Sequence, residues 1–360
     1  MYTAKVAEET DRADWQAYIE KRGVNHHAFA WEWREVFRAT FGHEPLYLIS
    51  RADVAAEGSG TISGVLPLML VKSMLFGRAL ISMPYLNAGG IIADDEESAA
   101  ALLTTARELA ETHKVKYVEL RHRADYPFPG SAAPGRQHKV AMKLQLRRDP
   151  EELLKSFKPK LRSQIRRPGK SGVYTVLSDE AGEKQLPDEK LLAAFYAVIA
   201  EHMRDLGTPV YPQQLFVATR RAFGQRSRII TVWLDGAPIA AGMTIGQGNS
   251  VEIPWASALR RYNNLSPNML LYWEAMRAGC LDGYDIFDFG RSSPDSGTYR
   301  FKQQWSAEPV PLDWRYPVAA EALPDVNPNS PKFAALVYCW QRLPLPVTNR
   351  LGPWLTRSIP

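Results

Sequence analysis

One strand–helix–strand pattern occurs twice in this chain of 360 residues. In the first half, a strand-like run ends at Pro84 and is followed by a helical run and the strand-like segment "VKYVELRH". In the second half, a strand-like run ends at Pro254 and is followed by a helical run and "YDIFDFG". Leu120 follows Pro84 by 36 positions, and Phe289 follows Pro254 by 35. A matched repeat of this size indicates a tandem duplication of one α/β domain, with chance agreement of two short patterns as the alternative.

Hydrophobic periodicity predicts the same order of elements in both halves. Two amphipathic helices are expected within 12–41 and two more at 188–207 and 211–224, and each pair precedes a set of strands. The expected strands are 45–51, 62–72, 78–84, 115–122 and 138–146 in the first half, and 228–236, 239–248, 250–257 and 284–290 in the second. We therefore predict a first domain at 1–147, a second at 148–316, and a C-terminal extension at 317–360.

The composition fits a folded protein with more than one domain. Apolar residues make up 45% of the chain and charged residues 23%, and 360 residues exceed what one ordinary core contains. The stretch "MYTAKVAEETDRADW" lacks the apolar segment of a secretory signal, and no window has the roughly 18 unbroken apolar residues of a membrane helix. The two cysteines, Cys280 and Cys339, lack metal-type spacing. We therefore expect a cytoplasmic protein with neither a disulfide framework nor a metal site.

The stretch "SPNMLLYWEAMRAGCLDGYDIFDFGRSSPDSGTYRFKQQWSAEPVPLDW" (266–314), with "LRSQIRR" and "GKSGV" upstream, resembles the FemAB-like branch of the GNAT N-acyltransferase superfamily. The resemblance covers roughly residues 10 to 320 and implies two successive GNAT-like domains, in agreement with the repeat. The segment "KFAALVYCWQRLPLPVTNRLGPWL" resembles the subgroup associated with exosortase and PEP-CTERM exopolysaccharide systems. The expected fold class is α/β (α+β), a tandem duplication of two GNAT-like N-acyltransferase domains with a C-terminal extension.

The resemblance implies transfer of an acyl or aminoacyl group to an amine of an anionic cell-envelope, peptidoglycan or exopolysaccharide-related precursor. The implied donor is aminoacyl-tRNA, an acyl carrier protein or acyl-coenzyme A, with no cofactor held tightly. The segment "LRRYNNLSPN" has no glycine, unlike the pyrophosphate loop of coenzyme A-dependent GNAT domains. The second half also lacks the inserted coiled-coil arm of the tRNA-using ligases. The sequence therefore leaves the donor open.

Four residues of the second half are candidates for catalysis. Asp288 ends a predicted strand, where open α/β sheets place ligands, and a carboxylate in a partly dry cleft can deprotonate an amine. Glu252, in the otherwise apolar strand "VEIPW", is the second candidate base. Tyr299 can protonate a leaving group, and Lys302 can stabilise a tetrahedral oxyanion. The structural alternatives are that Asp288 caps the following turn and is neutralised by Arg291, that Glu252 is an edge charge, and that Tyr299 belongs to the buried face of a strand.

Two further groups of residues are candidates for binding. The helix that begins after "RRYNNLSPN" presents unpaired N–H groups to a phosphate or a developing oxyanion, although Ser266 can equally be a simple helix cap. The residues predicted to bind the donor are Arg260, Arg261, Asn264, Ser266 and Asn268. The residues predicted to bind the acceptor or its phosphates are Lys158, Arg162, Arg166, Arg291, Ser292, Tyr85 and Asn87. Because one copy of a duplicated site is often lost, we expect the second half to hold the active one.

The most basic stretch of the chain is "KPKLRSQIRRPGKSGV" (158–173). On a helix, Lys158, Arg162 and Arg166 share one face beside an apolar stripe, and Pro168 ends the helix. The pattern predicts an amphipathic helix, and the resemblance implies that its basic face forms one wall of an anionic-substrate cleft between the domains. A merely solvated helix face is the alternative. Nucleic-acid binding through this stretch is a third hypothesis, which predicts an affinity that falls steeply with salt.

The segment 333–357 combines three arginines with two tryptophans and has no acidic residue. This composition suits peripheral contact with a lipid surface, whereas the prolines at 344, 346 and 353 favour a strap along the protein body. The resemblance implies an N-acyltransferase, which we expect in the cytoplasm, at the inner face of the membrane if this segment contacts lipid. The alternative is a non-catalytic module that binds an anionic glycan or lipid-linked precursor on the same fold.

Overall fold

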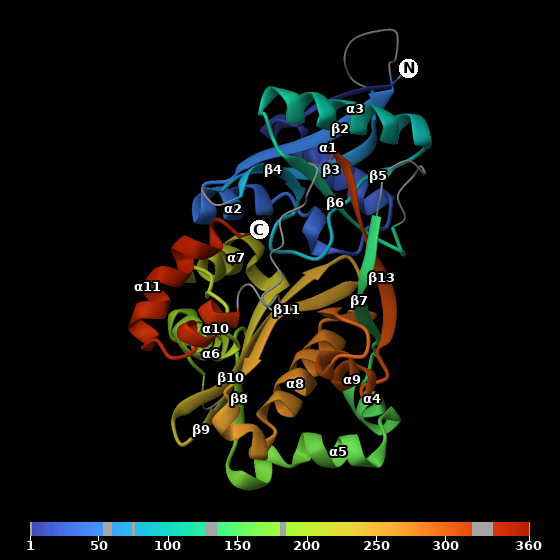
Figure 1. Cartoon of the computed structure of the whole chain (residues 1–360). Coiled ribbons are helices and arrows are strands. Elements are labelled where there is room, and N and C mark those ends of the chain that lie inside the picture. The colour runs from blue at the N-terminus through green and yellow to red at the C-terminus, as the bar shows by residue number, and fades with distance from the viewer. Residues whose placement is uncertain are drawn as a thin grey trace.

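The computed structural model describes residues 2–52, 60–73, 76–126, 135–180, 185–318 and 334–359. Within these residues one continuous mixed sheet of 13 strands runs through both halves of the chain (Figure 1). The strand order is β1-β2-β3-β4-β6-β13-β7-β12-β11-β10-β9-β8, with β5 paired to β3. The predicted α/β class is confirmed.

The first half contains the predicted helices and strands in the predicted order, and it adds two strands that were not predicted, at 2–6 and 92–93. Its helices are α1 (Arg12–Lys21), α2 (Trp33–Phe41) and α3 (Glu96–Thr112). Its strands are β1 (Tyr2–Val6), β2 (Glu44–Ala52), β3 (Ile62–Ser73), β4 (Gly77–Ser82), β5 (Ile92–Ala93), β6 (Tyr117–Arg123) and β7 (Gly135–Gln145). Local chemistry sets the helix ends. Asp95 caps α3 by accepting the backbone N–H of Ser98 at 2.8 Å, and Gly42 ends α2 at a φ of 67°.

The second half repeats this order after two short helices. Its helices are α4 (Pro150–Ser156), α5 (Pro159–Arg166), α6 (Asp188–Leu206), α7 (Gln213–Phe223), α8 (Pro267–Leu281) and α9 (Gly297–Gln303), followed by α10 (Ala334–Trp340) and α11 (Leu345–Thr356). Its strands are β8 (Tyr174–Leu177), β9 (Ser227–Leu234), β10 (Ala237–Gln247), β11 (Ser250–Ala258), β12 (Ile286–Ser292) and β13 (Glu308–Val318). The strand alternative for Tyr299 is wrong. Ser296 caps a helix there by accepting the Tyr299 N–H at 3.2 Å.

The sheet confirms the duplication. In each half a parallel pair of strands flanks a helix: β4 and β6 flank α3, and β11 and β12 flank α8. The two halves also exchange their last strands. β7 pairs with β12 of the second half, β13 pairs with β6 of the first half, and β7 and β13 pair with each other. Each half therefore uses a strand from the other. The exact domain boundaries along the chain stay predictions.

An aromatic core joins the halves away from the exchanged strands. Trp33 of α2 lies 5.0 Å from Phe223 of α7 and 6.5 Å from Trp255 of β11, measured between ring centroids. Trp33 is fully buried and Phe223 is 3% exposed, so this contact removes large apolar surfaces from water. No helix among the described residues has both the length and the apolar character needed to cross a bilayer.

Candidate functional site

The parallel strands β11 and β12 separate at the two carboxylates that the sequence singles out. Their paired residues run from Ser250 and Ile286 to Glu252 and Asp288. β11 continues to Ala258 and β12 to Ser292 without further pairing to each other. Glu252 and Asp288 therefore lie opposite each other on the last rung before the strands open. Both are buried, with 4% and 2% of their surface exposed.

Asp288 is held by an arginine from the first half. Arg123, which ends β6, places Nη2 3.1 Å from Asp288 Oδ2, and both side chains are 2% exposed. Asp288 Oδ1 accepts the backbone N–H of Gly290 at 2.8 Å. Arg123 also pairs with Asp125 at 3.1 Å, and these carboxylates raise its pKa despite burial, so it stays charged. Both carboxylate oxygens of Asp288 therefore bind protein groups, and its role is structural. The alternative that Asp288 caps the following turn is confirmed by the bond from the Gly290 N–H, but its charge is neutralised by Arg123 instead of Arg291.

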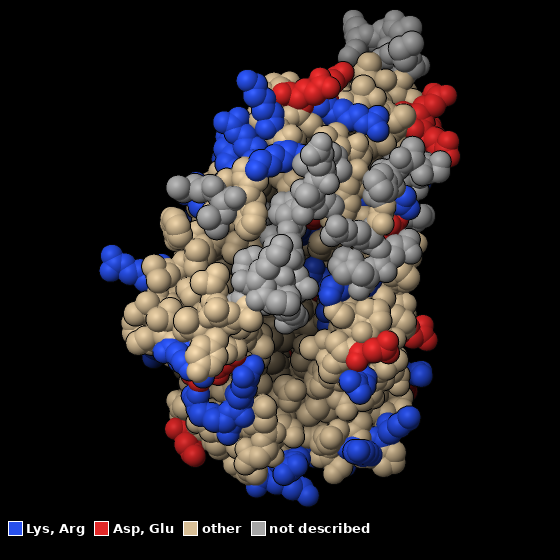
Figure 2. All heavy atoms as spheres, viewed as in Figure 1, with Lys and Arg blue, Asp and Glu red and all other residues tan. Residues whose placement is uncertain are grey.

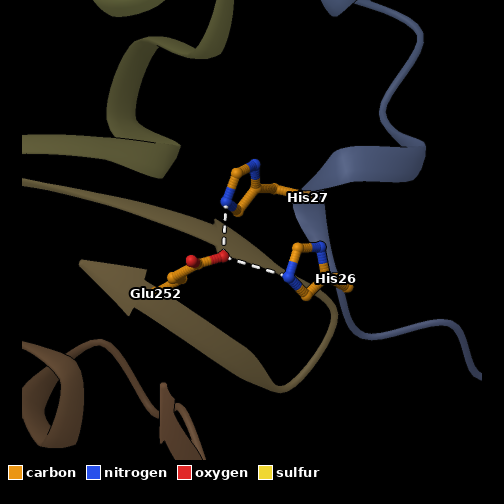
Figure 3. Close-up of side chains that lie close together, drawn as sticks. All are labelled: His26, His27 and Glu252. Atoms are coloured by element: carbon orange, nitrogen blue, oxygen red, sulfur yellow. Dashed lines mark hydrogen bonds and ion pairs between the residues drawn. The ribbon is translucent and has the colours of Figure 1, made fainter. Parts of the chain in front are cut away.

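Glu252 is held by two histidines that also come from the first half (Figure 3). Its Oε2 lies 3.0 Å from His26 Nε2 and 2.8 Å from His27 Nε2. Burial alone would raise the pKa of Glu252, but the two histidines lower it well below its usual value. Glu252 is therefore ionised, and the alternative of an exposed edge charge is wrong.

The two histidines and Glu252 also place three potential metal ligands within 4.8 Å of one another. A ligating histidine must offer a lone pair to the metal. Nδ1 of His26 accepts the backbone N–H of Ala28 at 3.1 Å, so the proton of the neutral ring sits on Nε2, facing Glu252. Burial, followed by the charge of Arg123, lowers the pKa of His26 and keeps the ring neutral. His26 Nε2 therefore has no lone pair for a metal here; it lies 3.0 Å from Glu252 Oε2 without forming a hydrogen bond of good geometry. The remaining two groups fall short of a three-ligand zinc site, and we assign no metal.

Lys302 completes the buried group of charges. From α9, its Nζ donates to the backbone oxygens of Gly290 at 3.0 Å and Arg291 at 2.9 Å. Burial lowers its pKa from 10.5 to about 8, although Asp288 and Glu252 act in the opposite direction. Gly290 adopts a φ of +71° in an irregularity of β12. A Cβ at Gly290 would lie 3.4 Å from Glu252 Oε1 and 3.8 Å from the amide nitrogen of Asn87. The predicted residue Asn87 therefore borders this site.

A basic group lies next to it, at the junction of the halves. Arg121 and Arg291 both face the ring of Trp314, with guanidinium carbons 4.4 Å and 5.5 Å from its centroid. Arg291 has part of its surface exposed to solvent. Desolvation by the many side chains around it, and the charge of Arg121, lower its pKa. Figure 2 shows a hollow near the middle of the molecule with basic side chains inside it. The adjacent Ser292 is 4% exposed, and its hydroxyl has no hydrogen-bond partner among the described residues.

In the predicted donor-binding loop, fewer side chains are free to bind a ligand than the sequence suggests. Residues 260–265 form a short 3-10 helix before α8. Arg261 forms an ion pair with Glu201 of α6, and its guanidinium lies 5.1 Å from the ring of Tyr262. Ser266 adopts a φ of 55°, and its side chain makes no capping hydrogen bond. The simple capping alternative is therefore wrong. Arg260, Asn264 and Asn268 lie on the same loop and the first turn of α8, with Arg260 and Asn264 exposed.

The basic segment forms the predicted helix, but in another place. α5 ends at Arg166, followed by the turn at Pro168, and Leu161 and Ile165 are buried against α8. Figure 1 places α5 at the end of the second half that is farthest from the first half. The prediction that Lys158, Arg162 and Arg166 line a cleft between the domains is therefore wrong. The helix packs its apolar stripe inward, and its charges point to water.

Two tyrosines among the predicted site residues have mainly structural contacts. The Tyr85 hydroxyl bonds to His43 Nε2 at 2.8 Å and donates to the Thr356 oxygen at 3.3 Å, and its ring stacks on Phe41 at 4.2 Å. It still lies at the junction of the halves, 5.8 Å from the ring of Tyr211. Tyr299 is partly buried against the core of the second half, one turn of α9 before Lys302.

Reasoning from the sequence missed His26, His27 and Arg123. The adjacency of two histidines was the one local signal for this pair. Arg123 follows an apolar strand and had no signal of its own. All three come from the first half, so the site is built from both halves. That the second half holds the active site stays a prediction.

Comparison with known proteins agrees with this architecture. Residues 155–303 match the family model described as "Acetyltransferase (GNAT) domain". The structure of FemX superposes with a TM-score of 0.62 at 15% identity and covers 86% of this chain and 96% of that chain. A tandem GNAT protein from the clavulanic acid biosynthesis pathway gives 0.51 at 12% identity, covering 90% and 99%.

A third similar structure is the C-terminal domain of a putative lysylphosphatidylglycerol synthetase from Agrobacterium fabrum. Its TM-score is 0.53 at 11% identity, and the match covers 86% of this chain and 93% of that chain. No curated protein sequence matches the chain. The chain thus carries a GNAT domain match in its second half and has the fold of tandem GNAT proteins throughout.

Proposed function

We propose that this protein is an N-acyltransferase that moves an acyl or aminoacyl group from an activated donor to an amine. The carrying observation is the opening between β11 and β12, which lies inside the GNAT domain match and begins at Glu252 and Asp288. Lys302 is buried beside this opening. In the reaction, the amine nitrogen forms a C–N bond with the donor carbonyl carbon. The donor's C–O or C–S bond breaks, and the amine proton ends on the leaving group or in solvent.

Lys302 is the residue that we assign to oxyanion stabilisation. Two of its N–H groups donate to the backbone oxygens of Gly290 and Arg291. Within the described residues its third N–H has no protein acceptor, so it can donate to the donor carbonyl as negative charge develops. With a pKa of about 8, the ammonium is the main form at neutral pH. A fixed cation in a dry site stabilises such charge more than one in water.

Glu252 is the residue that we assign to orienting the amine. Asp288 is occupied by Arg123 and the Gly290 N–H, and a bound carboxylate of this kind is a poor base. Glu252 uses Oε2 for both histidines, while its Oε1 accepts no hydrogen bond from the described residues. That oxygen lies next to Gly290, where the strands open. Because its pKa is low, Glu252 is suited to holding an N–H group rather than to removing the proton.

The acceptor that we propose carries an anionic group. Arg291 is exposed at the junction of the halves and Lys139 donates to Ser293 nearby, whereas the neighbouring Arg121 already pairs with Glu119 at 2.7 Å. A cell-envelope or exopolysaccharide precursor satisfies this requirement and agrees with the sequence resemblance. The name of the Agrobacterium fabrum protein refers to lysylphosphatidylglycerol, so anionic lipid precursors belong among the acceptors to try. We leave the donor as an aminoacyl-tRNA, an acyl carrier protein thioester or a coenzyme A thioester.

The test compares Lys302→Met and Lys302→Arg with the wild type. Each protein receives the three donor classes in turn with an envelope-precursor extract, and mass spectrometry detects amide products. We expect one donor class to give product and Lys302→Met to lower the rate by about a hundredfold or more, because one oxyanion donor is lost. Lys160→Met, on the exposed side of α5, is the matched control and should keep the wild-type rate.

Arg291→Met should instead raise KM for the acceptor with little effect on kcat. If wild type and Lys302→Met form the same amount of product, the assignment of Lys302 is wrong. If precursors bind tightly but no donor class yields an amide, the protein is a binding module and the proposed activity is overturned.

A further inference from the structure

α11 buries small residues and exposes large apolar ones, which is the opposite of what a surface helix usually does. Its buried residues are small: Thr348, Gly352 and Thr356, at every fourth position. A Cβ at Gly352 would lie 2.9 Å from the backbone of Val210, so the helix approaches the body closely on this side. Three of its large apolar residues, Val347, Leu351 and Trp354, are exposed to water, while Leu345 and Leu355 are partly buried. A surface helix normally buries such residues, and this one exposes three of them.

The exposed residues of α11 form one stripe. Val347, Leu351 and Trp354 follow the spacing i, i+4 and i+7, and 39%, 44% and 59% of their surfaces are exposed. α10 adds Leu336 and Tyr338 at 66% and 58%. We call Leu206, Leu336, Tyr338, Val347, Leu351 and Trp354 the tail patch.

Leu206 belongs to the tail patch although it ends α6. Its neighbours Asp205 and Gly207 contact Gln341 and Val337 directly. Among the described residues, one other large apolar side chain, Leu281 on α8, is comparably exposed. Six of seven such side chains thus lie on α10, α11 and the end of α6 that adjoins α10, and Figure 1 shows α10 and α11 on the outside of α6. Concentration of exposed apolar surface marks an interaction site.

The charges around the tail patch are basic. Arg342 places its guanidinium carbon 3.3 Å from the ring centroid of Tyr338, and Arg350 is exposed within the α11 stripe. Residues 334–359 contain no acidic residue. The acidic residues nearby on α6 are neutralised, because Asp205 pairs with Arg204 at 2.7 Å and Glu201 pairs with Arg261. A partner for this surface therefore carries negative charge around an apolar layer.

We propose that the tail patch binds the surface of a bilayer that contains anionic lipid. Trp and Tyr suit the boundary between lipid headgroups and acyl chains, and arginines beside them suit anionic headgroups. Leu336, Leu351 and Trp354 supply the apolar depth of such a contact. α10 and α11 are too short to span a bilayer, so the binding is peripheral. This inference does not depend on the proposed transferase activity.

The test is cosedimentation of the full chain with vesicles. One set contains phosphatidylcholine alone, and the other contains phosphatidylcholine and phosphatidylglycerol in equal amounts. We expect binding to the anionic vesicles and little to the neutral ones. The double variant Leu351→Ser/Trp354→Ser should weaken binding by about tenfold or more. Arg342→Ser and Arg350→Ser should each weaken it by about fivefold.

Leu281→Ser is the matched control, because Leu281 is 60% exposed but lies on α8, outside the tail patch. It should bind the anionic vesicles as the wild type does. All variants change exposed side chains, and their circular dichroism and thermal unfolding should match the wild type. Equal binding of the tail-patch variant and the wild type overturns the proposal. Absence of binding to the anionic vesicles also overturns it. The proposal is likewise overturned if the wild type sediments as a dimer and the Leu351→Ser/Trp354→Ser variant sediments as a monomer.

Discussion

At the residue scale, the chemistry depends on charges that are buried and shared between distant parts of the chain. Arg123 neutralises Asp288, and His26 and His27 hold Glu252. Lys302 lacks a carboxylate partner at ion-pair distance among the described residues and bonds to backbone oxygens instead. Its charge is therefore the least compensated of the group, which makes its protonation sensitive to pH.

Lys302 should make stability depend on pH in a defined direction. The pKa of Lys302 is about 8 in the folded protein and 10.5 ordinarily. Between these values the unfolded chain holds a proton that the folded chain lacks, so raising the pH stabilises the folded state. We expect the free energy of unfolding of the wild type, relative to Lys302→Met, to rise by on the order of 1 kcal/mol per pH unit between pH 8 and 10. Urea denaturation at several pH values measures this, and a constant difference contradicts it.

The same group should shape the pH dependence of turnover. If charged Lys302 stabilises the oxyanion, kcat falls above about pH 8 as its proton is lost. In Lys302→Arg the guanidinium stays charged, so the remaining activity should persist to higher pH. Initial rates between pH 6 and 10 test this. A decline at the same pH in both proteins would assign the titration to another group.

At the scale of elements, the irregular part of β12 places the site. Between Asp288 and Arg291 the register against β7 shifts, and Gly290 takes up a left-handed conformation. This shift leaves Asp288 buried while Arg291 faces solvent at the junction of the halves. Bulges of this kind often re-aim side chains next to functional sites.

Gly290→Ala should therefore damage both stability and function. A φ of +71° costs a residue with a Cβ about 1–2 kcal/mol, and this Cβ would also approach Glu252 Oε1. Gly236→Ala is the matched control, because Gly236 has a φ of +76° in the β9–β10 turn with nothing within 4 Å of a Cβ. Thermal unfolding should show similar losses in both variants. Turnover should fall in Gly290→Ala alone. Equal turnover in the two variants would contradict a role of the irregular part of β12 in catalysis.

At the scale of the whole molecule, the exchange of β7 and β13 makes the halves interdependent. Each half completes its sheet with a strand of the other, and the aromatic core of Trp33, Phe223 and Trp255 spans the junction. The ion pair between Arg123 and Asp288 crosses the same junction.

Breaking this ion pair from one side should be costly. We expect Arg123→Met to lower the free energy of unfolding by about 3–5 kcal/mol, because it leaves buried carboxylates without their cation. The double variant Arg123→Met/Asp288→Leu should lose clearly less than the sum of the two single variants. Urea denaturation of the four proteins completes the cycle. Additive losses would show that the two side chains do not interact in the folded protein.

Although the local pattern of the sequence did not predict β1, β5, β8 or the exchanged strand β13, it determined most of the helices and strands, the duplication, and the strands that carry Glu252 and Asp288. These follow from periodicity and from helix-ending residues such as Gly42 and Pro168, which act over a few positions along the chain. The same local signals predicted the α5 helix correctly but could not say which side of the molecule it occupies.

Tertiary structure alone decided how the site is assembled. His27 and Glu252 are 225 positions apart, and no periodic pattern links residues at that distance. The exchange of β7 and β13 brings the halves together, so that Arg123 meets Asp288 and the loop before α2 delivers His26 and His27. Burial then fixes the charges: it lowers the pKa of Lys302 and His26, while the histidines keep Glu252 ionised. The residue types were readable in the sequence, but their partners and protonation depend on contacts that form only when both halves fold together.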